Sequence, residues 1–237
     1  MACSRLEVSF RFAILPVLGL ISLFVASAAS QDSSSSSSSP HPAISSRSTV
    51  PSSASSAAGS IRNNVYRNSF FGFACKIPEA WVLRTDEMNT QGLQGENEEN
   101  PKSGKDSANL GRVLLAAFSR PPLAHGEDVN SSILIAAENA AAYPGLKDPA
   151  QYFGPITEIA KAQGFDVDEE PYEFAVGTKT LVRGDFEKNV GTRVMHQSTL
   201  VMLAHGYALS FTFIGGTEDE VEELVHGLSF PASKNTR

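Results

Sequence analysis

A repeating apolar stripe near the C-terminal end of the chain gives the clearest structural signal. Its four members recur at the spacing of one helical face: Val221, Leu224, Val225 and Leu228. Thr217 and Glu220 precede the stripe at the spacing of a capping box, a pairing that satisfies free N–H groups at the start of a helix. The pattern predicts an amphipathic helix that begins after Thr217 and packs on a core.

A second helix is predicted to begin at Asp148, whose side chain can cap it, with Pro149 in the first helical position. Three apolar residues share one face of this helix: Phe153, Ile156 and Ala160. Pro155 is expected to kink or delay the helix, so we expect Ile156–Gln163 to be its most regular part. Gly164 is placed to end it.

Apolar runs predict the strands of a sheet. Arg112–Ser119 and Ser132–Ala137 are nearly continuous apolar runs, which are typical of central strands covered on both faces. A meander follows the first helix: Thr180–Glu187, a turn around Asn189–Gly191, Thr192–Ala204, a two-residue hairpin turn at His205 and Gly206, and Tyr207–Ile214. The meander indicates mostly antiparallel pairing.

The segment before these strands is less regular. Tyr66–Ile77 is predicted to be one extended segment that Pro78 ends, and Trp81–Leu83 to begin the next short strand. Polar composition predicts long loops at Thr85–Asn109 and Arg120–Ser131. Together the elements predict an α+β fold: a largely antiparallel sheet flanked by helices, as an α/β/α sandwich.

The first thirty residues have the pattern of a cleavable signal peptide. Arg5 and Arg11 are followed by an apolar block, Phe12–Val25, that is shorter than the roughly 20 residues a membrane helix needs. Small residues at 26–30 offer two cleavage sites. An uncleaved anchor and a chloroplast transit peptide are the alternatives. A lipid anchor is not expected, because the cysteines are only Cys3 and Cys75.

Composition divides the rest of the chain in two. Residues 31–60 are rich in serine and have too few large apolar side chains to offset the entropy of ordering the backbone. We therefore expect a disordered linker there, either inert or glycosylated. Residues 61–237 are the length of one domain, which is predicted to be a single α/β unit.

Charge restricts the partners. The chain carries a formal net charge of −7, and no run of Lys and Arg stands out along the sequence. Nucleic acid and anionic lipid are therefore not expected as partners, nor is insertion in a membrane after cleavage. A protein partner is expected, and the number of subunits is left open.

Motifs for catalysis or metal binding are not found. Cys75 alternates with Phe71, Phe73 and Ile77, so a buried, inert thiol is expected. The five histidines lack metal-ligand spacing: His41, His125, His196, His205 and His226. No serine-hydrolase elbow or phosphate-binding loop occurs. We therefore predict no catalytic, cofactor-binding or metal-ligating residues, and no cofactor.

Three weaker features could bind a ligand or carry a modification. Glu96, Glu98 and Glu99 could hold Ca²⁺, although they lack the alternating pattern of an ordered site. Gly215 and Gly216 precede the last helix, where an anion could bind, but the acidic residues after them would repel it. Asn130 begins an N-glycosylation sequence, which has meaning only in a eukaryotic secretory pathway.

Several aromatic and turn residues carry a family resemblance: Tyr66, Phe71-Gly72-Phe73, Pro78 and Trp81, together with the closing strand 206–211, the capped helix and Ser229-Phe230. Over residues 65–231 this pattern resembles the superfamily of the photosystem II extrinsic protein PsbP and the yeast Ran-binding nuclear import factor, which has uncharacterised exported bacterial members. The resemblance implies an antiparallel sheet between helices. It transfers no functional residue, because these motifs are structural.

The sequence thus predicts an exported, secreted or periplasmic, non-enzymatic interaction or accessory domain whose long loops contact a partner. One alternative is an extracytoplasmic carrier that holds a small apolar ligand between the sheet and a helix, in a cavity of several hundred Å³. The other is a secreted hydrolase of unrecognised type, built around Cys75, His196 and nearby acids.

Overall fold

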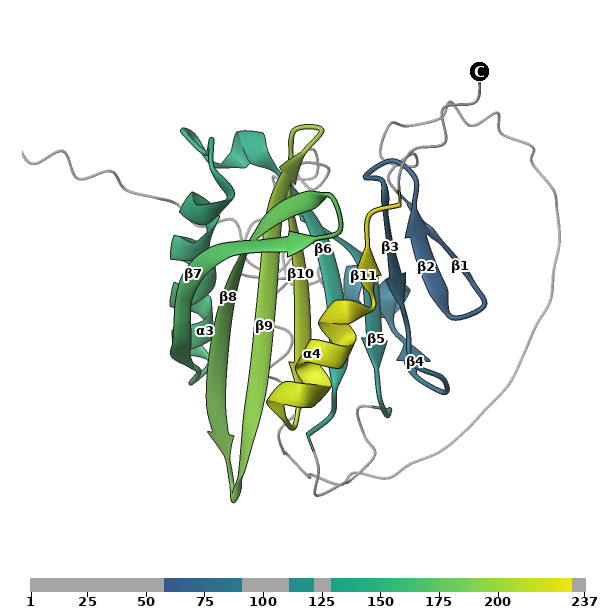
Figure 1. Ribbon diagram of the computed structural model, residues 1–237, viewed down its shortest axis with the longest axis vertical. Coiled ribbons are helices and arrows are strands. Elements are labelled where there is room, and N and C mark those ends of the chain that lie inside the picture. The colour runs from purple at the N-terminus through teal and green to yellow at the C-terminus, as the bar shows by residue number, and fades with distance from the viewer. Residues whose placement is uncertain (1–57, 91–110, 122–128, 232–237) are drawn as a thin grey trace, which may run out of the picture.

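The computed structural model describes residues 58–90, 111–121 and 129–231 and contains two antiparallel sheets (Figure 1). The seven-stranded sheet has the order β4-β5-β6-β10-β9-β8-β7. Its strands are β4 (Val82–Leu83), β5 (Arg112–Phe118), β6 (Ser132–Asn139), β7 (Asp166–Val176), β8 (Lys179–Val190), β9 (Arg193–Ala204) and β10 (Tyr207–Gly215). The four-stranded sheet has the order β1-β2-β3-β11, with β1 (Ser60–Arg62), β2 (Val65–Asn68), β3 (Phe73–Lys76) and β11 (Leu228–Ser229).

Among the described residues, helices and 3₁₀ turns cover one face of the seven-stranded sheet. The 3₁₀ turns η4 (Ala140–Ala142) and η5 (Pro149–Tyr152) lead into α3 (Phe153–Ala162). Phe153, Ile156 and Ala160 pack against Val182 and Val201 of the sheet. Gly184 is required beneath this helix, because a Cβ there would lie 2.6 Å from a ring carbon of Phe153.

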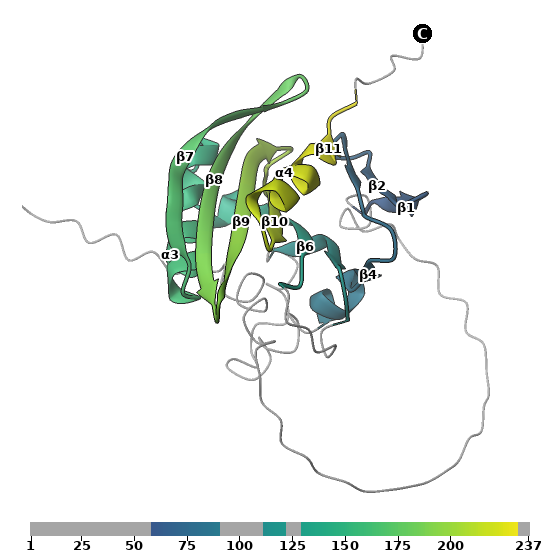
Figure 2. The same cartoon turned by 60° about the horizontal axis from the view of Figure 1, so that its bottom comes forward.

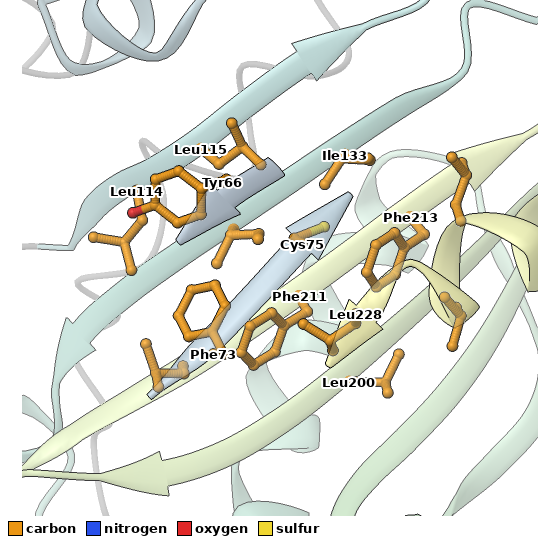
Figure 3. Close-up of a cluster of buried hydrophobic side chains, with 14 of the residues drawn as sticks. Tyr66, Phe73, Cys75, Leu114, Leu115, Ile133, Leu200, Phe211, Phe213 and Leu228 are labelled. Carbon is orange, nitrogen blue, oxygen red and sulfur yellow. The ribbon is translucent and has the colours of Figure 1, made fainter. Parts of the chain in front are cut away.

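The other face is covered by α4 (Glu218–His226) and by the four-stranded sheet (Figures 1 and 2). Val221, Leu224 and Val225 of α4 join apolar residues of both sheets in one core. Figure 3 shows Cys75 and Phe73 of β3 among Phe211 and Phe213 of β10. The Phe73 and Phe211 rings meet edge to face with centroids 5.0 Å apart.

The α+β fold, with a largely antiparallel sheet between helices, is as predicted. The meander, the central strands β5 and β6, and the short strand β4 lie where the apolar pattern indicates. Asp148 caps η5, accepting from the Ala150 N–H, and the α-helix is delayed to Phe153 ahead of Pro155. Gly164 follows the helix at φ 83°, and His205 and Gly206 form the two-residue turn.

Four expectations about elements are corrected. The segment Tyr66–Ile77 is not one extended piece: β2 and β3 form a hairpin around a turn in which the Gly72 N–H donates to the Asn68 carbonyl. Thr85–Thr90, expected in a loop, are helical, and Met88 packs on the sheet. Leu228, expected on the last helix, belongs to β11, and Ser60, expected in the linker, begins β1.

The capping box at α4 is also rearranged. Thr217 accepts from the Glu220 N–H, as expected. Glu220, however, accepts from the Gly216 N–H and from the Ser131 hydroxyl instead of the Thr217 N–H. The carboxylate therefore joins the helix start to the strand β6 region.

The predicted signal peptide, the linker up to residue 57, most of the two long loops, and the residues His41, Glu96, Glu98, Glu99 and His125 lie outside the described residues. Within the described ranges, no helix is long and apolar enough to cross a membrane.

Candidate interaction surface

Two turns that are far apart in the sequence meet at one end of the sandwich. The β2–β3 turn carries Phe70 and Phe71, and the β9–β10 turn carries His205. Phe70 is one of three large apolar side chains identified as exposed in the described part of the chain, at 37 %. We call the exposed Phe70 and His205, together with the half-buried Tyr207, the aromatic patch.

The patch is held together by ring contacts. The Phe70 ring centroid lies 5.0 Å from that of His205 and 4.7 Å from that of the buried Phe71. Tyr207 meets Phe71 edge to face at 5.6 Å, so Phe71 supports the surface from below. Such pairs fix ring positions at little entropic cost, which suits a side chain that anchors a partner.

Backbone geometry fixes the histidine in place. His205 and Gly206 have φ of 52° and 80°, the conformation that a two-residue turn between antiparallel strands requires. Glycine adopts it freely, whereas a side chain such as that of histidine pays a modest penalty. The Gly206 carbonyl accepts from the Ala140 N–H, so the turn is tied to η4. The patch is therefore presented by a well-fixed support.

Cys75 has no geometry for nucleophilic catalysis. Its side chain is fully buried between the two sheets, and burial raises the pKa of the thiol to about 12. Its Sγ lies 3.7 Å from the Lys76 carbonyl oxygen, a weak contact. A thiol held protonated in the core cannot supply the thiolate that a cysteine hydrolase needs.

The described histidines lie on different elements of the fold. His196 is half-buried in β9, opposite Glu187 and Gly215, while Cys75 belongs to the other sheet. His226 is exposed in the last turn of α4. Of the three described histidines, only His205 joins the aromatic patch, and no group of metal-binding side chains was found among the described residues. Cys75 and His196 therefore do not form the pair of nucleophile and base that the hydrolase alternative needs.

A buried arginine connects β8 to α4. Arg183 donates to Asp185 at 3.0 Å and to Glu222 at 2.5 Å. Its guanidinium carbon lies 5.0 Å from the ring centroid of Phe174, and Tyr172 donates to Asp185. Although burial opposes it, the carboxylates raise the pKa of Arg183, so the network holds a fixed charge. Since each charged group is paired, the network fits a structural role.

A second buried polar cluster involves a carboxyl group without a cation. Glu138 in β6 accepts from the Tyr143 hydroxyl, and Tyr152 also hydrogen-bonds to it. Burial raises the pKa of Glu138, and the hydroxyls counter this only in part. The three groups join β6 to the turns before α3, which again fits a structural role.

The possible glycosylation site is used internally. Asn130 accepts from the Ser119 hydroxyl and the Arg120 N–H, and its amide donates to the Arg120 carbonyl. Ser131 is buried and donates to Glu220. Both residues close the start of β6. The carrier alternative places an apolar ligand between the sheet and a helix, but core side chains occupy the space beneath α4 (Figure 3) and beneath α3.

The sequence pattern did not single out the aromatic patch. Phe70 stands in an aromatic pair that the alternation assigned to a strand, and His205 was noted only as a turn residue. A phenylalanine in a four-residue turn is the one signal that could have found it, since turns normally carry polar residues. The contact between the two turns is a tertiary feature.

No protein-family model matches the chain, and no curated protein matches it. Similar solved structures include a protein of unknown function from Pseudomonas aeruginosa, with 17 % identity and a TM-score of 0.31 over 43 % of this chain and 68 % of that one. LpqN, involved in cell envelope biogenesis of Mycobacterium tuberculosis, has 14 % identity and a TM-score of 0.33 over 67 % and 83 %.

The Ran-binding protein Mog1p of Saccharomyces cerevisiae has 11 % identity and a TM-score of 0.35 over 68 % of this chain and 80 % of that one. Likenesses this low in identity and TM-score assign neither a family nor a function to the chain.

Proposed function

We propose that this chain is an exported, non-enzymatic protein-binding domain that uses the aromatic patch to anchor a protein partner. The observation that carries the proposal is Phe70, a large apolar side chain that is exposed to solvent and fixed in position by ring contacts with Phe71 and His205. Exposed aromatic residues on a rigid support are favoured as anchors, because little conformational entropy is lost when they are buried by a partner.

The absence of an enzyme's machinery from the named candidates supports the non-enzymatic part of the proposal. Cys75 is a protonated core thiol, and the networks of Arg183 and Glu138 join secondary-structure elements. The contacts described for the aromatic patch are between rings, so we assign the patch a role in binding. This proposal assigns the contact with the partner to two short turns, whereas the sequence analysis expected the long loops to make it.

Export remains an expectation from residues 1–30. Its direct test is the N-terminal sequence of the protein recovered outside the cytoplasm. We expect it to begin after Ala28 or Ser30, because both follow small residues that signal peptidase admits. Recovery of the chain with Met1 intact would contradict cleavage.

The interaction is tested by placing a photo-crosslinking amino acid at residue 70 in the full chain, expressed in its own cells. Leu83 offers a matched control, since it is also apolar and is 48 % exposed but lies on β4. We expect one discrete protein adduct from residue 70 and not from residue 83. Equal labelling from both positions, or none from residue 70, contradicts the proposal.

A substitution then tests whether the patch supplies affinity. Phe70→Ser is expected to reduce co-purification of the adducted protein at least tenfold, since truncating an anchor typically costs about 2 kcal/mol. Leu83→Ser should leave it unchanged. Both substitutions place a polar side chain at an exposed position, so we expect the fold to be retained. Circular dichroism checks this.

A further inference from the structure

Register in the four-stranded sheet brings together three basic residues that are separate in the sequence. Tyr66, Cys75 and Leu228 face the core, so the alternate residues face outward. Arg62 pairs with Val65, which pairs with Lys76, so these three form one row across β1, β2 and β3. Arg67 follows Val65 by two positions on the same face.

The three basic side chains, Arg62, Arg67 and Lys76, are exposed, and we call them the basic face. Neighbouring strands lie ~4.8 Å apart and alternate residues ~6.6 Å apart. The charges therefore lie within about one Debye length of each other at physiological salt and act on an incoming ligand together. Val65, half-buried, supplies an apolar centre.

Within the described residues, no carboxylate is found paired with this face. The strands of the sheet read SIR, VYRN, FACK and LS, without an acidic residue. None of the three ion pairs found among the described residues includes Arg62, Arg67 or Lys76. The sign of the charge on these strands is thus opposite to the net charge of the chain, which is −7. The three residues are separate in the sequence, so no run of Lys and Arg marks this face.

We propose that the basic face binds an acidic segment of a protein partner, and that Phe70, in the turn joining β2 to β3, extends this surface to the aromatic patch. This inference rests on the proposed function and names the chemistry of its partner. An acidic segment matches the charge of the face, and Val65 offers its apolar side chains a contact. The orientation of the bound segment is left to experiment.

Charge elsewhere on the molecule favours a protein segment over a lipid surface or nucleic acid. β7 alone carries five exposed acidic residues: Asp166, Asp168, Glu169, Glu170 and Glu173. These carboxylates lie at the other end of the fold from the basic face, and they contribute to a net charge of −7 that repels an extended anionic surface, such as a bilayer or a duplex, more than it repels a short segment. A peptide segment contacts only the basic face.

The test is a titration of the full chain with a short fluorescein-labelled peptide of alternating glutamate and valine, followed by fluorescence anisotropy. The triple variant Arg62→Glu, Arg67→Glu, Lys76→Glu is expected to weaken binding at least tenfold, because three attractive charges become repulsive. Raising NaCl from ~50 to ~300 mM is expected to weaken binding to the unaltered chain, since exposed charges are screened.

The matched control reverses three exposed lysines elsewhere: Lys147→Glu, Lys161→Glu and Lys179→Glu. It changes the net charge by the same amount, yet we expect it to retain peptide binding within about twofold. Equal losses in both triple variants would show that only net charge matters and overturn the proposal. Failure of the unaltered chain to bind the peptide also overturns it.

Two further probes separate the classes of ligand. Vesicles of phosphatidylglycerol and phosphatidylcholine, and a DNA duplex, are expected to bind more weakly than the peptide. Tighter binding of either, lost in the Arg62, Arg67 and Lys76 variant, would assign the face to that ligand and overturn the acidic-segment proposal.

The two proposals fail separately. The peptide titration needs no native partner, so its failure leaves a residue 70 adduct standing. Conversely, the peptide can bind although residue 70 yields no adduct. This result would contradict the role of Phe70 as an anchor and leave the proposal for the basic face standing.

Discussion

The two ends of the fold carry charges of opposite sign. β7 lies at one end and the β1–β2 hairpin at the other (Figure 2). At the β7 end, carboxylates crowd an exposed strand, and the buried Arg183 is fully paired with Asp185 and Glu222. At the other end, Arg62, Arg67 and Lys76 are exposed and make no ion pair with a described carboxylate. A buried cation that is paired with carboxylates stabilises the fold, whereas exposed cations without such partners are available to bind a ligand.

The acidic strand also has a structural explanation. β7 is an edge strand of the seven-stranded sheet, and such edges invite pairing with other chains. Its carboxylates and Pro171 discourage that pairing, because charge and a missing N–H both oppose an added strand. Protection of an edge therefore accounts for the acidic end. At the basic end it can account only for Arg62 on the edge strand β1, because Arg67 and Lys76 lie on the inner strands β2 and β3.

The largest expected effect comes from removing the paired cation. Arg183→Ala leaves Asp185 nearly buried without its partner and releases Glu222 of α4. We expect a loss of about 3 kcal/mol in the free energy of unfolding, typical of a broken buried ion pair. Urea denaturation followed by circular dichroism measures it. Arg67→Ala is the matched control at the basic end, and an equal loss there would erase the comparison.

A smaller effect concerns the buried carboxyl without a cation. Because burial raises the pKa of Glu138 in the folded state, the folded protein holds this proton more tightly than the unfolded chain. Stability from this group is therefore present below the unfolded pKa of ~4.3 and is lost as pH rises through the folded pKa. Glu138→Gln should remove this decline.

Urea titrations at several pH values from ~4 to ~8 compare Glu138→Gln with the unaltered chain. The difference in unfolding free energy should shift in favour of the variant as pH rises. A difference that does not change with pH would show that Glu138 is ionised as readily in the folded protein as in the unfolded chain.

A gain in stability below about 1 kcal/mol is expected for His205→Asn, because asparagine tolerates the left-handed turn better than most side chains. If the ring belongs to the binding surface, the same variant should bind the protein partner less tightly. Thermal unfolding and co-purification together measure the two effects. Lower stability in the variant would indicate that the ring contact with Phe70 outweighs the turn conformation.

The smallest effect is expected at the basic face itself. Arg62→Ala and Lys76→Ala should each change the free energy of unfolding by less than ~0.5 kcal/mol, as is usual for exposed side chains with few contacts. Urea denaturation checks this. A loss above 1 kcal/mol would reveal a structural role and weaken the inference that these residues are kept for binding.

Local patterns predicted the elements whose burial is periodic. The stripe of α4 and the alternation in β10 reflect a single buried face, so the residues alone are sufficient. β7 was missed because its sequence DVDEEPYEFAV has little alternation, and pairing with β8 makes it a strand. The β2–β3 hairpin was missed because Phe71, within the turn, is buried like Phe73 of β3, so the apolar alternation runs on through the turn.

The candidate surfaces were harder to predict for a physical reason. Arg62, Arg67 and Lys76 share a face only through the register of three strands, and Phe70 meets His205 only after both sheets have packed. The burial of Cys75, by contrast, followed from neighbours on its own strand. Sequence periodicity reports on local burial, whereas binding surfaces here depend on long-range contacts.

An NMR titration of the ¹⁵N-labelled chain with the glutamate-valine peptide locates the binding surface residue by residue. We expect chemical shift changes concentrated in β1, β2, β3 and the turn that carries Phe70, with β7 and α3 unaffected. Changes centred on another surface, or no changes at peptide concentrations that saturate the anisotropy signal, would contradict this expectation.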